Sequence, residues 1–231
     1  MKKSNYAVET QNLSISWGEV NVLNQLNFKL NDGEKLAIVG PSGSGKSTIL
    51  KILAGLILPT KGELKIFGKK QIYLRLDQNN PPDVRLVFQN PALLGSLTIK
   101  ENVGFLLKRN KNLSKNLINE IVRECLAEVG LFNVENKLPN ELSGGMQKRV
   151  SFARALITDQ TLNAKTKPLL LFDEPTAGLD PIASSRIEDL INKTNDKANG
   201  SSIVVSHVLS TIERTSDKVL MLYGGKFRWA G

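Results

Sequence analysis

The stretch Gly40-Pro41-Ser42-Gly43-Ser44-Gly45-Lys46-Ser47 decides the fold. It follows a short apolar run, Lys35–Val39, which favours a buried strand, and it leads into a mostly apolar segment, Ser47–Leu58, which is long enough for a helix. Glycines at this spacing let the backbone turn so that successive N–H groups face a polyphosphate, and the start of the helix adds a positive partial charge. A chance glycine-rich turn would not need this strand and helix around it. We therefore predict a loop that binds phosphate groups.

Two carboxylates at a second strand end complete the predicted chemistry. We expect Lys46 to reach the β- and γ-phosphates and the Ser47 hydroxyl to ligate Mg²⁺. The apolar run Leu169–Phe172 ends in Asp173 and Glu174. Asp173 is predicted to hold Mg²⁺ through its water shell, and Glu174 to polarise a water for attack on the γ-phosphate. Such a pair could simply cap a strand, but beside a complete phosphate loop it indicates hydrolysis.

The only histidine of the chain, His207, follows another predicted strand, Ser202–Ser206. Ligands of open α/β sheets bind at the carboxyl ends of the strands. We therefore expect His207 to contact a γ-phosphate. A purely structural histidine is the alternative.

The remaining patterns predict the fold class. Strand patterns alternate with helix patterns, which indicates an α/β fold with a mostly parallel sheet covered on both faces. Residues 6–40 are predicted as strands and form an antiparallel β part at the N-terminus. Residues 68–82 are polar and predicted as a loop. Ser114 is a plausible N-cap for a helix that Gly130 would end. We expect one domain over residues 1–231, with a helical subdomain inserted at about 90–157.

Composition narrows the class of protein without deciding the function. The chain has 231 residues, of which 41% are apolar and 23% charged, so it is neither disordered, collagen-like nor a disulfide scaffold. Its single cysteine, Cys125, favours a reducing compartment. No apolar run reaches the roughly 20 residues of a membrane-spanning helix, and no signal-peptide pattern follows the basic N-terminus. The net charge of +9 is compatible with solvated faces, and we expect no nucleic-acid partner.

Residues 142–147, with the sequence LSGGMQ, resemble a motif of a known protein family. They resemble the signature motif of ABC-type ATPases. The other motifs of that family are similar and in order: Gln89 stands as the Q-loop glutamine, Asp180 as the D-loop aspartate and His207 as the switch histidine. Trp17 stands where the family has an aromatic ring that stacks on adenine. The resemblance covers nearly the whole chain and implies the core of a P-loop NTPase.

The resemblance implies ATP and Mg²⁺ as cofactors and a head-to-tail dimer of two copies. Each ATP would lie between the phosphate loop of one copy and the signature motif of the other, where Ser143 and Gly145 would contact the γ-phosphate. The implied catalytic residues are Glu174, His207 and Gln89. The implied metal ligands are Ser47, Gln89 and Asp173. The other implied nucleotide-binding residues are Trp17, Gly40, Ser42, Gly43, Ser44, Gly45, Lys46, Ser47, Thr48 and Asp180.

A narrower resemblance concerns the cargo. Residues 95–105 and 143–150 resemble the ATPase subunit of Mla/Mce-type phospholipid transporters, and residues 180–184 and 223–231 are similar to its plastid and cyanobacterial branch. This resemblance implies a multi-span permease that contacts the helical insert, and an Mce-type lipid-binding protein as an indirect partner. The chain would then lie on the cytoplasmic or plastid stromal face of a membrane as a peripheral subunit.

Two other functions are compatible with the same head. A soluble, non-transport ABC ATPase, such as an iron–sulfur cluster assembly ATPase, would be equally short. Relatives that act on DNA need long coiled coils, which this chain lacks. A catalytically inactive binding module is disfavoured because Lys46, Gln89, Glu174 and His207 are all present.

Overall fold

A six-stranded sheet forms the centre of the protein in the computed structural model, which describes residues 5–79, 81–109, 113–157 and 167–231. Its strand order is β10-β9-β3-β8-β7-β6, and all neighbours pair in parallel except β9 and β10. The strands are β3 (Lys35–Val39), β6 (Val84–Val87), β7 (Leu169–Asp173), β8 (Ser201–Val205), β9 (Lys218–Tyr223) and β10 (Lys226–Ala230). The prediction of a mostly parallel sheet is confirmed.

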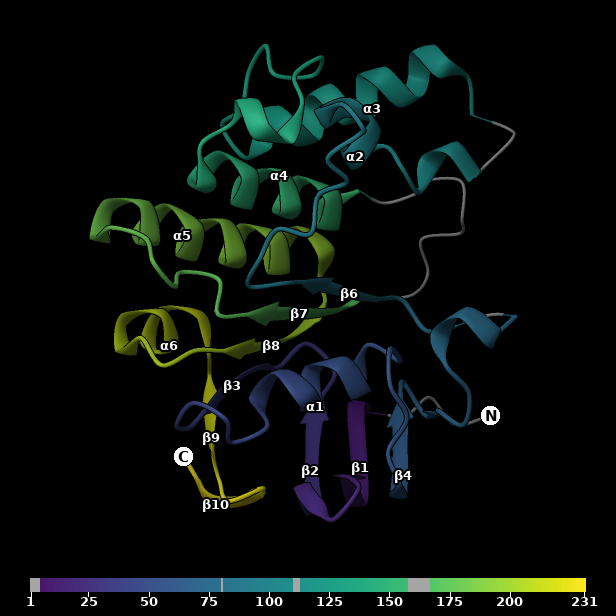
Figure 1. Cartoon of the computed structure of the whole chain (residues 1–231), viewed down its shortest axis with the longest axis vertical. Helices are drawn as coiled ribbons and strands as arrows, with labels where there is room; N and C mark the ends of the chain where they lie inside the picture. The colour runs from purple at the N-terminus through teal and green to yellow at the C-terminus, as the bar shows by residue number, and fades with distance from the viewer. Residues whose placement is uncertain (1–4, 80, 110–112, 158–166) are drawn as a thin grey trace.

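A separate antiparallel sheet is built from the N-terminal part of the chain, as predicted. Its order is β2-β1-β4-β5, and its strands are β1 (Tyr6–Trp17), β2 (Val20–Asn31), β4 (Lys61–Ile66) and β5 (Lys69–Lys70). Helix α1 (Lys46–Leu53) lies between the two sheets (Figure 1). Its fully buried Ile49, Leu50, Ile52 and Leu53 join side chains of both sheets in one apolar core.

Helices cover the opposite face of the six-stranded sheet. They are α2 (Ile99–Val103), α3 (Lys115–Glu128), α4 (Gly144–Leu156), α5 (Pro181–Ala198) and α6 (Leu209–Thr215), of which α2 and α3 pack on α4. In Figure 1 the longer ones lie in layers above the sheet, with α5 nearest, then α4, then α3. Successive residues of β7 serve both cores: Leu169 and Leu171 face α1, whereas Leu170 and Phe172 join the helices. This burial on both faces explains why the strand is a continuous apolar run.

The helical subdomain follows its local sequence signals closely. The Ser114 hydroxyl accepts a hydrogen bond from the Leu117 N–H and caps α3, and α3 ends before Gly130, which has φ +68°. In α4, Val150 and Ala153 are fully buried, as their spacing predicts. The subdomain limits of about 90–157 and the single-domain division remain predictions.

Two predicted boundaries are wrong. The first helix ends at Leu53 rather than near Leu58, because Gly55 turns the chain with φ +69° and packs against Arg75. Residues 68–82 are not entirely loop, since they contain β5 and a short 3₁₀ helix, η1 (Arg75–Asp77). The described part of the chain contains no helix with the length and apolar content that crossing a membrane requires.

Candidate nucleotide-binding site

The phosphate loop connects β3 to α1 in a conformation that requires glycine. Gly40 has φ +155°, and a Cβ there would lie 2.1 Å from the Leu222 carbonyl oxygen. Gly45 has φ +103°, and a Cβ there would lie 2.6 Å from the Leu23 side chain. Gly45 is also the N-cap of α1 and offers no side-chain acceptor, so the first N–H groups of the helix remain open to an anion.

Two side chains of this loop suit a phosphate ligand. The Lys46 ammonium group is buried and donates hydrogen bonds to the carbonyls of Gly40 (2.8 Å) and Pro41 (3.1 Å). The Ser44 hydroxyl is buried and has no hydrogen-bond partner among the described residues. A buried hydroxyl without a partner is costly, and an anion bound in the loop would satisfy it. Thr48 is buried in the first turn of α1.

Two oxygen atoms at the start of α1 and the end of β7 form a suitable cation site. The Ser47 hydroxyl donates a hydrogen bond of 3.0 Å to Asp173 Oδ1. Burial raises the pKa of Asp173, the bond from Ser47 lowers it, and the charge of Glu174 raises it further. Hydroxyl and carboxylate oxygens are ligands that Mg²⁺ accepts. No group of three or more His, Cys, Asp or Glu residues is poised for a metal in the described ranges, so nucleotide oxygens and water would complete the shell.

Glu174 and His207 meet at the adjacent edge of the sheet. Asp173 pairs with Val205 across the parallel strands β7 and β8, so the residues that follow both strands emerge side by side. Glu174 has φ +46°, and its Oε2 atom lies 2.9 Å from Nδ1 of His207. Glu174 is nearly buried, whereas the His207 side chain is 66% exposed. The expectation that His207 lies at this edge is met, and its partner in this structure is Glu174.

The other predicted residues lie on different elements. Ser143 caps α4, since its hydroxyl accepts a bond from the Met146 N–H, and Ser143 is exposed. A Cβ on Gly145 would have no described atom within 4 Å outside its own helix. Asp180 caps α5 by accepting bonds from the N–H groups of Ile182 and Ala183. Ser143 is therefore open to solvent, and Gly145 has open space beside it.

Trp17 and Gln89 make no polar contact with the phosphate loop among the described residues. Trp17 ends β1 and is 56% exposed; the adjoining strand β2 packs its Leu23 against Gly45. Gln89 is exposed two residues after β6, which pairs in parallel with β7. No hydrogen bond within the described ranges joins Gln89 to Ser47 or Asp173. Its role as a metal ligand stays a prediction.

Sequence reasoning missed Lys148. It lies in α4, and its ammonium group reaches backbone carbonyls of the segment that follows Glu174. A lysine placed one and a half turns after the Ser143 N-cap was the available signal, but helix periodicity alone does not say which loop it would meet.

A phosphate loop between strand and helix, two carboxylates at the neighbouring strand end and an inserted helical subdomain define a nucleotide-hydrolysing α/β protein. The chain belongs to the ABC transporter family, whose model matches residues 23–177. It is an ATP-binding and ATP-hydrolysing subunit of an ABC transporter.

Individual proteins support this assignment. The chain is 49% identical to Protein TRIGALACTOSYLDIACYLGLYCEROL 3, chloroplastic, of Arabidopsis thaliana, over 99% of this chain and 69% of the relative. It is 36% identical to the intermembrane phospholipid transport system ATP-binding protein MlaF of Haemophilus influenzae, over 91% of this chain and 78% of the relative. A dimeric structure of the ATP-binding cassette MJ0796 bound to ADP and Pi superposes with a TM-score of 0.82, at 30% identity over 97% of both chains.

Proposed function

We propose that this subunit powers phospholipid transport. The observation that carries this proposal is the similarity to the phospholipid transport ATPase MlaF over most of both chains, together with the 49% identity to the chloroplastic Arabidopsis protein. The name of MlaF states phospholipid as the cargo. The chloroplastic location in the name of the Arabidopsis protein supports the stromal face of a plastid membrane as one location. The subunit itself would be peripheral and held by a permease.

The site residues divide the chemistry among them. The phosphate loop and Lys46 bind the triphosphate, and the exposed ring of Trp17 stacks on adenine. Ser47, Asp173 and Gln89 would hold Mg²⁺, which when bound neutralises phosphate charge. Glu174 polarises the attacking water. The 2.9 Å contact to His207 supports this role, because it orients the carboxylate at the strand end.

A second copy of the chain completes the site. Ser143 and Gly145 are open on the surface of this chain, at the N-terminus of a helix that favours an anion. Ile182 and Leu209, beside Asp180 and His207, are 69% and 67% exposed. Exposed apolar side chains around a polar site are typical of a surface that a partner covers. The MJ0796 cassette, whose fold this chain shares, has been solved as a dimer.

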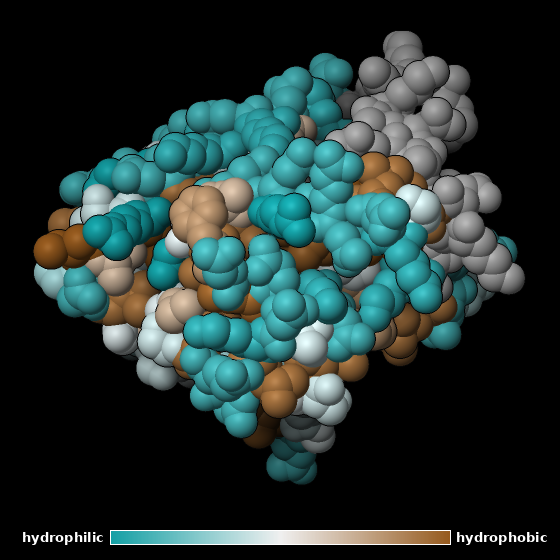
Figure 2. Space-filling view, turned by 90° about the horizontal axis from the view of Figure 1, so that it is seen from above, coloured by the Kyte–Doolittle hydropathy of each residue, from teal (hydrophilic) through white to brown (hydrophobic). Residues whose placement is uncertain are grey.

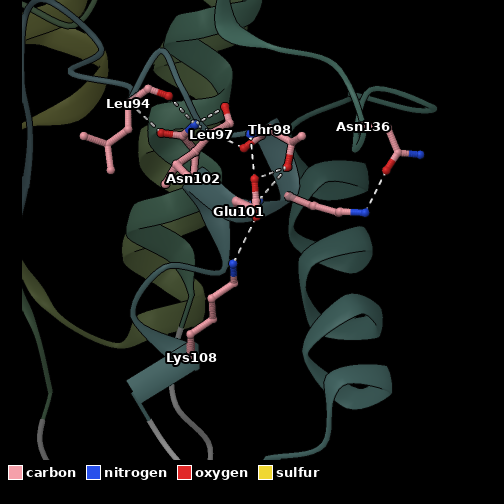
Figure 3. Close-up of polar contacts among 8 residues, drawn as sticks. Leu94, Leu97, Thr98, Glu101, Asn102, Lys108 and Asn136 are labelled. Carbon is pink, nitrogen blue, oxygen red and sulfur yellow. Dashed lines mark hydrogen bonds and ion pairs between the residues drawn. The ribbon is translucent and has the colours of Figure 1, made fainter.

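The permease would bind the loop before α2. Figure 3 shows this loop held by Asn102, whose buried amide donates to the carbonyls of Leu94, Leu97 and Thr98 and accepts from the Leu94 N–H. Thr98 and Glu101 form a capping box at the start of α2. The loop backbone is therefore rigid.

This rigid loop and the end of α2 expose apolar side chains. Leu94, Phe105 and Leu106 are 46%, 48% and 56% exposed. Figure 2 looks onto the helical end of the molecule, where polar residues predominate and apolar groups form separate patches. We define Leu94, Phe105 and Leu106 as the α2 patch and propose that a helix of the permease packs on it.

The test is a gentle-detergent pull-down from native membranes with the tagged chain. We expect a multi-span permease and an Mce-domain protein to co-purify. Phe105→Glu should abolish this recovery, while Trp229→Glu should not; Trp229 is a slightly more exposed aromatic in β10, at the opposite end of the molecule (Figure 1). Recovery of iron–sulfur assembly proteins, or of no membrane protein, would contradict transport and leave the ATPase assignment intact.

A further inference from the structure

Helix α4 is tied to the loop that follows Glu174 through one side chain. The Lys148 ammonium donates hydrogen bonds to the carbonyl of Ala177 (2.5 Å) and, more weakly, to that of Pro175 (3.5 Å). Within the described ranges these are the only hydrogen bonds between α4 and the segment Glu174–Asp180. Both acceptors are backbone atoms, so the contact sets the path of the loop rather than the rotamer of one side chain.

The opposite side of the same loop is anchored differently. The Thr176 hydroxyl pairs with the Thr211 hydroxyl of α6 at 2.8 Å, and Thr211 in turn donates to Glu188, which is buried in α5. The loop is thus held between α6 on one side and α4 on the other. Helix α4 also packs on β7 through Phe152, whose ring stacks on Phe172, but Lys148 is its hydrogen-bonding link to the loop itself.

The electrostatics of Lys148 suit this task. The side chain is half-buried, and no carboxylate among the described residues lies within ion-pair distance of it. Burial lowers the pKa of the Lys148 ammonium, and the charge of Glu174 partly restores it. The ammonium therefore depends on the two carbonyls for its hydrogen bonds, and Glu174 is the carboxylate whose field it feels.

Lys148 lies on the same helix, α4, as the signature motif. Ser143, the second residue of the signature motif, caps the same helix five residues earlier, which is about 7.5 Å along the axis. The far end of α4 is also fastened, since Arg154 donates to the carbonyls of Pro91 (3.0 Å) and Ala92 (2.9 Å), just after Gln89. A displacement of α4 would therefore act on the loop after Glu174.

We propose that Lys148 is a positioning residue that couples α4, the helix that begins at the signature motif, to the Glu174–Asp180 loop. Binding of the signature motif at one ATP site would then fix the position of Glu174 at the other site. The inference rests on the proposed dimer, in which the signature motif of a chain and its Glu174 serve different nucleotides. Lys148 is assigned no contact with ATP or with the attacking water. It acts through the backbone that carries Glu174 and Asp180.

The test compares Lys148→Met with Lys148→Arg and with Lys193→Met, a control at an exposed lysine of α5. Three quantities are measured on each 231-residue chain: ATP affinity, kcat for phosphate release and the Hill coefficient for ATP. For Lys148→Met we expect kcat to fall about tenfold and the Hill coefficient to approach 1, with ATP affinity unchanged, because a misplaced loop affects the transition state and not ground-state binding. Lys148→Arg should restore most of kcat because it keeps a charged donor.

Two results would overturn the proposal. One is a folded Lys148→Met chain with the kcat and Hill coefficient of the wild type. The other is a parallel loss of kcat, ATP affinity and Tm that Lys148→Arg does not restore, which would make the contact merely structural. Failure of the proposed dimer has a separate signature, because Glu174→Gln would then form no ATP-dependent dimer.

Discussion

The two halves of the nucleotide site differ in how far one chain completes them. In the phosphate-loop half, the residues from α1, β7 and β8 already contact each other: Ser47 binds Asp173, and Glu174 binds His207. In the signature half, Ser143 is exposed and its hydroxyl binds only its own helix, while Gly145 has open space beside its Cα at the start of α4. The sheet of one chain organises the first half, and in the proposed dimer a second copy would complete the other. The difference predicts that some single substitutions will weaken ATP binding, whereas others will slow ATP hydrolysis and leave ATP binding unchanged.

The largest effect should come from Glu174→Gln. Loss of the water-polarising carboxylate should lower the rate of phosphate release about a hundredfold or more, because general-base catalysis contributes this much. ATP should still bind, and an ATP-bound dimer should accumulate on size-exclusion chromatography. A wild-type rate in this variant would show that Glu174 does not act on the water.

Lys46→Ala should impair ATP binding in the phosphate-loop half of the site. The lost charge-assisted bonds should weaken ATP affinity about tenfold or more, measured by titration with a fluorescent nucleotide. Lys51→Ala, at an exposed lysine of the same helix, is the matched control and should bind ATP like the wild type. Equal affinities for the two variants would contradict the role of Lys46.

Ser143→Ala should affect only the signature half. Phosphate release should fall by about tenfold, while the affinity of the isolated chain for ATP stays unchanged, because the hydroxyl would act in the partner's site. Loss of the cap itself should cost about 1 kcal/mol of stability. Ser114→Ala removes the equivalent cap from α3 and controls for this: it should lower Tm similarly and leave phosphate release intact. If both variants lose activity equally, the trans role of Ser143 is wrong.

The smallest effect concerns pH. Burial raises the pKa of Asp173 above its ordinary value of 3.8, so acidification protonates it sooner and relieves a buried charge in the free chain. Mg²⁺ needs the ionised carboxylate, so the Mg²⁺-dependent gain in ATP affinity should shrink by less than about tenfold as the pH falls from 7 towards 5. Calorimetric titration at several pH values measures this, and Asp173→Asn should show neither the gain nor its pH dependence.

Local sequence signals predicted the elements that hold the site. Glycine spacing located the phosphate loop, and Ser114 and Gly130 located the ends of α3. Prediction was weaker where packing decides the conformation. The end of α1 depends on the contact of Gly55 with Arg75, some twenty residues away, and the 3₁₀ turn at Arg75 depends on the same contact. A pattern read along the chain does not contain such a contact.

The sequence by itself determined the chemistry: a glycine-rich loop, two carboxylates after an apolar run and a histidine after another, each fixed by short-range order along the chain. The tertiary structure decided which of these groups meet. Parallel pairing of β7 with β8 brings Glu174 to His207, and the packing of α4 brings Lys148 to the carbonyls of Pro175 and Ala177. Strand order and helix packing arise from burial of apolar faces far apart in sequence, so these contacts exist only once both cores have formed.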